Sequence, residues 1–91
     1  MKDETILTRH PGGKKGRKIT KQKYDAVKRA MLSALRSREL THTELMRALR
    51  GKLKGKFDGN VSWYGETLKL DLEARRVVER TETKPQKYRL R

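Results

Sequence analysis

One run of residues, 60 to 80, carries the densest apolar pattern in an otherwise very polar chain. Within it Val61, Tyr64, Leu68 and Leu72 recur at helical spacing and therefore share one face of a helix. A second stripe lies almost opposite and consists of Trp63, Thr67, Leu70 and Ala74. A helix with two apolar sides typically lies between two other elements. The run therefore predicts a packed helix around which the rest of the chain is arranged.

The ends of this helix can be predicted from local signals. The hydroxyl of Ser62 is a candidate N-cap, because it can accept one of the free N–H groups of the first turn. After Arg75 and Arg76 the periodicity ends in Val77-Val78, which favours a strand. We therefore expect a helix over residues 62–76 that runs directly into a strand.

Two more helices are expected before it, over residues 20–37 and 41–54. Thr20 is a candidate N-cap for the first, and Thr41 with Glu44 forms a capping box for the second. Alternation of apolar and polar residues near the C-terminus predicts a hairpin over residues 77–90. The predicted core consists of Tyr24, Val27, Met31, Leu35, Leu45, Leu49, Phe57, Leu68, Leu72, Val78 and Leu90.

Residues 1–18 contain Pro, Gly and many basic side chains, with little that could pack. The favoured interpretation is a basic N-terminal arm, followed by one domain over residues 19–91. The alternative is a weak hairpin, because Ile6-Leu7 and Ile19 could pair as short strands around a turn.

The composition narrows the range of functions. A net charge of +14 attracts polyanions, of which nucleic acid is the commonest. The plainer alternative is that the charge only keeps the protein soluble and has no binding role. The chain has no cysteine, which excludes disulfides and thiolate metal sites. No apolar run is long enough for a signal peptide or a membrane span, so we expect a cytoplasmic protein without a membrane partner.

The order of three helices and a hairpin resembles the winged helix-turn-helix superfamily. More narrowly, it resembles a family of small, uncharacterised basic bacterial winged-helix proteins, over about residues 5–91. The residues that carry the resemblance are Tyr24-Asp25-Ala26-Val27, Leu40-Thr41-x-x-Glu44-Leu45, Phe57-x-Gly59, Trp63-Tyr64, Lys69-Leu70-Asp71-Leu72-Glu73-Ala74-Arg75 and Glu79-Arg80. It implies a fold that is mainly α with a small β-hairpin (α+β): a three-helix winged helix-turn-helix domain with a C-terminal wing.

The resemblance also implies that the third helix enters the major groove of DNA and that the wing touches its backbone. Helix 62–76 departs from a strongly basic reading helix, because its acidic and basic side chains nearly balance. Its candidate contacts are Ser62, Trp63, Glu66, Thr67, Lys69 and Leu70. Candidate phosphate contacts are Lys14, Lys15, Arg17 and Lys18 in the arm, Lys52, Lys54 and Lys56 before the helix, and Arg80, Lys84, Lys87 and Arg89 in the wing.

The prediction is therefore a nucleic-acid-binding protein, with duplex DNA favoured, acting as a small transcriptional regulator or nucleoid-associated factor. One alternative is a protein–protein adaptor or homodimer that uses the stripe of Trp63 and Leu70. Another is an RNA- or ribosome-associated basic protein. No catalytic triad, metal-ligand spacing or phosphate-binding Gly loop occurs, so we expect neither an enzyme nor a cofactor.

Overall fold

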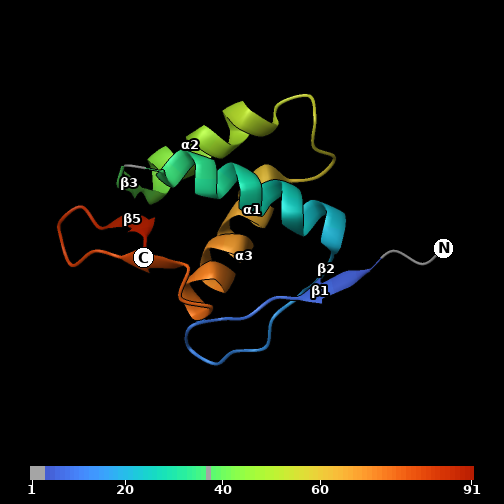
Figure 1. Ribbon diagram of the computed structural model, residues 1–91, viewed down its shortest axis with the longest axis horizontal. Helices are drawn as coiled ribbons and strands as arrows, with labels where there is room; N and C mark the ends of the chain where they lie inside the picture. Colours follow the sequence, from blue (N-terminus) through green and yellow to red (C-terminus); the bar gives the residue numbers. More distant parts are fainter. Residues whose placement is uncertain (1–3, 37) are drawn as a thin grey trace.

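In the part of the chain that the structure describes, three helices and two small antiparallel sheets form the fold (Figure 1). The computed structural model describes residues 4–36 and 38–91. The elements in chain order are β1 (Thr5–Leu7), β2 (Lys18–Thr20), α1 (Lys21–Leu35), β3 (Leu40–Thr41), α2 (His42–Leu53), α3 (Val61–Ala74), β4 (Val78–Arg80) and β5 (Lys87–Leu90). The predicted α+β class with three helices and a C-terminal hairpin is confirmed.

The helices begin where side chains can accept free backbone N–H groups. Thr20 accepts from the N–H of Lys23, and Thr41 and Glu44 form the predicted capping box. The predicted cap of α3 was wrong by two residues. Asn60 Oδ1 accepts from the N–H of Trp63 at 3.0 Å, so α3 starts at Val61, and the hydroxyl of Ser62 instead accepts from Arg50 at 3.0 Å.

The C-terminal end of α3 is a Schellman turn. Arg76 takes a positive φ of 64°, its N–H bonds the carbonyl of Glu73, and the N–H of Val77 bonds that of Leu72. The helix therefore ends two residues earlier than the sequence indicated and turns directly into β4.

The C-terminal hairpin is joined to the helices by β3, a strand of two residues that the sequence analysis missed. The sheet order is β3-β5-β4, with Leu40 opposite Tyr88 and Val78 opposite Leu90. Because β3 directly precedes α2, this pairing closes one end of the helix group.

The N-terminal segment forms the hairpin that was the alternative to a basic arm. Strands β1 and β2 pair antiparallel with Ile6 opposite Ile19, and Ile19 is buried in the core. Strand β2 spans the expected boundary between residues 18 and 19 and continues into α1. The first three residues of the expected arm lie outside the described part of the chain.

The helices enclose one apolar core, in which most of the predicted residues are buried. Phe57 is only partly buried, and Leu90 is 36% exposed. The placement of Leu90 in the core was wrong. It is on the same sheet face as Val78, but at the end of β5, where it lies beside Leu35 in a hollow on the surface. Among the described residues, no helix is long and apolar enough to cross a membrane.

Candidate nucleic-acid interface

The connection between β1 and β2 runs along α3, far from it in sequence (Figure 1). We call residues 8–18, which are this connection and the first residue of β2, the basic loop, because they include five cationic side chains: Arg9, Lys14, Lys15, Arg17 and Lys18. This loop is the most cationic connection in the fold, and its position depends on a few polar contacts.

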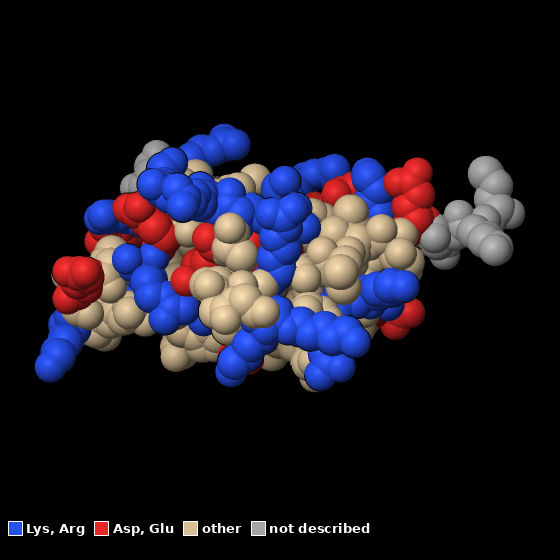
Figure 2. Space-filling model, turned by 90° about the horizontal axis from the view of Figure 1, so that it is seen from below, with Lys and Arg blue, Asp and Glu red and all other residues tan. Residues whose placement is uncertain are grey.

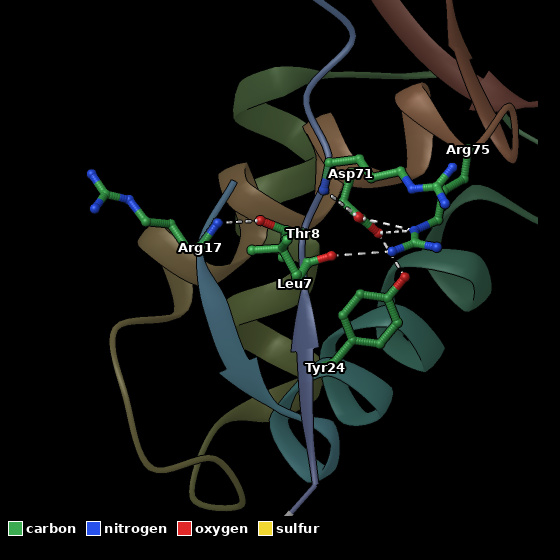
Figure 3. Close-up of polar contacts among 7 residues, drawn as sticks. Leu7, Thr8, Arg17, Tyr24, Asp71 and Arg75 are labelled. Carbon is green, nitrogen blue, oxygen red and sulfur yellow. Dashed lines mark hydrogen bonds and ion pairs between the residues drawn. The ribbon is translucent and has the colours of Figure 1, made fainter. Parts of the chain in front are cut away.

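Asp71 on α3 anchors the basic loop (Figure 3). Its side chain is fully buried and accepts the backbone N–H of Arg9 at 2.8 Å and the hydroxyl of Tyr24 at 2.6 Å. Arg75 supplies the countercharge, with its Nε 3.0 Å from both carboxylate oxygens. Burial, together with the bond to Asp71, raises the pKa of Tyr24 to about 12, so this hydroxyl stays a donor at neutral pH. The carboxylate thus joins the loop, α1 and α3.

The two ends of the loop are also bound to each other. The N–H of Thr8 donates to the carbonyl of Arg17 at 2.9 Å, and the N–H of Arg17 donates to the Thr8 hydroxyl at 2.8 Å. Gly16 allows this approach, because a Cβ there would lie 1.7 Å from the carbonyl oxygen of Thr8. The loop is therefore closed by its own backbone as well as anchored by Asp71.

The loop covers part of the second apolar stripe of α3. One hollow is lined by Arg9, His10, Lys15, Arg17, Thr67 and Leu70, and an adjoining one has Lys14 and Ala74 among its lining residues. Leu70 and Ala74 are both half-buried, so the prediction of a helix packed on two sides holds for its C-terminal half. Trp63, at the uncovered end of the stripe, is 43% exposed and packs edge-on against Tyr64.

No ion pair joins the five cations of the basic loop to any residue of 4–36 or 38–91. In Figure 3 the side chain of Arg17 extends away from the other labelled residues. Figure 2 shows the face that carries this loop, where many Lys and Arg side chains lie beside uncharged areas, with some Asp and Glu side chains toward its left and right ends. We call this surface, formed by the basic loop and the outer side of α3, the loop–helix surface.

Lys69 does not belong to the loop–helix surface, and its prediction as an exposed contact was wrong. It is only 6% exposed, and its Nζ donates to His42 Nδ1 at 2.9 Å and to the Tyr88 hydroxyl at 3.1 Å. The ring of Tyr88 also lies 4.3 Å from the ammonium, a cation–π contact. Lys69 therefore joins α3 to α2 and β5, while Ser62, Trp63 and Glu66 are exposed as expected.

Two of the four predicted wing cations are held in ion pairs. Arg80 makes a two-pronged contact with Glu73, at 2.9 and 2.8 Å. Arg89 bonds both Glu79, at 2.6 Å, and Glu39, at 2.9 Å. Lys84 is exposed and Lys87 half-buried, so the wing offers less free charge than its sequence suggests.

The three lysines before α3 do not form one group. Lys54 and Lys56 are exposed between α2 and α3, but the Nζ of Lys52 donates to the hydroxyl of Ser33 on α1, at 3.2 Å. Lys52 therefore lies on the side of α2 that faces α1. Sequence reasoning missed Arg9 and Arg50, which flank α3, and the anchoring role of Asp71. Arg9 could have been predicted as a candidate contact, because it lies close in sequence to the other loop cations. The sequence holds no comparable signal for Arg50 or Asp71.

The contact between Lys69 and His42 predicts a pH effect on stability. An ammonium can only donate, so His42 Nδ1 must be an acceptor and the ring is neutral. Burial, then the charge of Lys69, lowers the pKa of His42 below its usual value, with a smaller opposing effect from Glu66. The unfolded chain consequently takes up this proton first as pH falls through about 6.5, and folding stability decreases.

We expect wild-type protein to lose more thermal stability between pH 7.5 and 5.5 than His42→Gln, in which the amide oxygen can accept from Lys69. Thermal melts of both proteins at the two pH values measure this difference, and His10 is common to both. Equal losses would show that His42 is not the titrating group.

The chain is thus a small α+β protein whose most distinctive surface is a cationic loop fixed against its third helix. It belongs to a protein family of unknown function, DUF6958, which matches residues 5–88. No curated protein and no solved structure matches the chain.

Proposed function

We propose that this protein binds duplex DNA through the loop–helix surface, mainly by contacts to phosphates. The observation that carries the proposal is the group of five cations on the basic loop, which have no ion-pair partner among the described residues. Asp71 of α3 anchors this loop through the backbone N–H of Arg9. Lys and Arg side chains on a fixed loop can neutralise phosphates without an acidic neighbour that competes for them.

We further propose that the fold is a winged helix. The order of the elements supports this proposal. Helices α2 and α3 are followed by the hairpin β4–β5, and β5 pairs with β3, the strand that precedes α2. The connection of residues 54–60 is longer than that of a tight helix-turn-helix. The loop–helix surface lies on the outer side of α3, the helix that enters the major groove in that fold.

Weak sequence preference follows from the side chains of α3. Trp63 and Ser62 are exposed at its N-terminal end, but Glu66 is exposed too and repels phosphates, while Lys69 is buried. Few groups remain that could form two bonds to one base edge, the geometry that gives most discrimination. A nucleoid-associated role therefore agrees better with this surface than a regulator that recognises one operator.

Fluorescence anisotropy at several salt concentrations tests the proposal. The labelled ligands are a duplex of about 20 base pairs, its single strand and a structured RNA. We expect the logarithm of the duplex association constant to fall linearly with the logarithm of the salt concentration. The expected slope is about −0.9 per phosphate contact, with about four to eight contacts. Two unrelated duplex sequences should bind with similar affinity, because phosphate contacts carry no base information.

Three results would contradict the proposal. Absence of duplex binding at about 50 mM salt, where phosphate contacts are strong, would exclude it. Tighter binding of structured RNA would favour an RNA-associated protein. A stable dimer that Trp63→Ala dissociates, without nucleic-acid binding, would favour the adaptor.

A further inference from the structure

A second basic surface lies between α1 and α2. A groove there is lined by four cationic side chains and one carboxylate: Arg36, Arg38, Arg47, Lys52 and Glu44. Its other lining residues include Ala34 and Ala48, whose small side chains leave the space between the two helices open. We call this feature the α1–α2 groove.

Three of the four cations of the α1–α2 groove, Arg36, Arg38 and Arg47, make no side-chain hydrogen bond to the described residues, while Lys52 donates one to Ser33. All four are exposed, and none forms an ion pair with a residue in the described ranges 4–36 and 38–91. The one carboxylate of the groove, Glu44, accepts the N–H of Thr41 at 2.9 Å in the capping box, and its charge leaves the groove with a net excess of three positive charges. Repulsion among four cations in one groove would be relieved by a bound polyanion.

The α1–α2 groove faces away from the loop–helix surface. Two neighbouring cations of α2 reveal the geometry: Arg50 donates to Ser62 on α3, whereas Lys52 donates to Ser33 on α1. In Figure 1 α2 lies above α1, and the β1–β2 connection lies below it. The groove and the loop–helix surface share no residue and no secondary-structure element. One ligand on each surface would therefore not overlap the other.

We propose that the α1–α2 groove binds the phosphate backbone of a second duplex, so that one molecule bridges two DNA segments. This inference rests on the proposed function for the first segment. The groove is open and its cations are exposed along its walls, which suits successive phosphates of a backbone. A small anion would instead need donors that converge in an enclosed site.

A bead assay tests bridging directly. A biotinylated duplex on streptavidin beads is mixed with protein and with a free fluorescent duplex, and the fluorescence that the beads recover is measured. The groove variant carries Arg36→Gln, Arg38→Gln and Arg47→Gln. The matched loop variant, with the same net charge, carries Lys14→Gln, Lys15→Gln and Arg17→Gln. Anisotropy with a short duplex of about 15 base pairs measures binding to a single segment, and thermal melts check folding.

We expect the groove variant to keep single-duplex affinity within about threefold at 150 mM salt but to lose about 90% of bridging. The loop variant should lose most of its single-duplex affinity, because only the weaker groove contacts remain, and should lose bridging as well. Groove-variant beads that recover as much duplex as wild type would overturn the inference. The inference would also be overturned if wild-type protein bound the immobilised duplex but the beads recovered no free duplex. Wild type that does not bind even the immobilised duplex would instead refute the proposed function itself.

Discussion

Asp71→Ala is expected to lower the free energy of unfolding by about 3–5 kcal/mol, the usual cost of removing one member of a buried ion pair. The change leaves the guanidinium of Arg75, the hydroxyl of Tyr24 and the N–H of Arg9 without their acceptor. Because Asp71 also anchors the basic loop, the variant should bind duplex DNA more weakly even where it remains folded. Urea unfolding and anisotropy at low temperature measure the two effects.

Asp25→Ala is the matched control. Asp25 pairs with Lys21 at 2.7 Å on the surface of α1, where the two side chains are 42% and 50% exposed. Such a surface pair contributes about 0–1 kcal/mol, so stability and DNA binding should barely change. Similar losses in the two variants would contradict the anchoring role of Asp71.

Leu68→Ala or Leu72→Ala is expected to cost about 2–5 kcal/mol, because each leaves a cavity in a core that cannot collapse fully. Both side chains are completely buried on the face of α3 that meets the core. A domain of this size is stable by only about 5–15 kcal/mol, so either variant could be largely unfolded at 37 °C. Urea unfolding at 25 °C gives the difference.

Leu7→Ala makes the same chemical change on the surface, where Leu7 is 56% exposed. Its expected cost is within about 0.5 kcal/mol. If Leu68→Ala and Leu7→Ala unfolded at the same urea concentration, α3 would not pack as described.

The helices could be predicted because their signals are local. Apolar periodicity and the caps at Thr20 and Thr41 lie within a few residues of the structure they specify. Strand β3 could not be predicted, because two residues are too few to show a periodic pattern. Leu40 and Thr41 form a strand only because they pair with β5, which lies far along the chain. The N-terminal hairpin was ambiguous for the same reason, since its turn is long and its strands have three residues each.

The candidate site was harder to predict than the fold, because free charge depends on distant partners. From the sequence Arg89 looks like a phosphate contact, yet in the fold it pairs with Glu79 and with Glu39, which lies 50 residues earlier in the chain. Lys69 lies off the apolar stripes and looks exposed, but His42 and Tyr88 bury it. Asp71 looks like a charge that weakens DNA binding, whereas it holds the basic loop in place.

The salt dependence of duplex affinity in two double variants tests the central claim most directly, that the basic loop contacts phosphates. Lys15→Gln with Arg17→Gln removes two loop cations, and Arg80→Gln with Arg89→Gln removes two cations held in ion pairs. The net charge of the two proteins is the same. We predict that the plot of log K against log salt becomes shallower by about 1.8 in the loop variant and stays near the wild-type slope in the other. Equal slopes in both variants, or a change only in the Arg80 and Arg89 variant, would contradict the account.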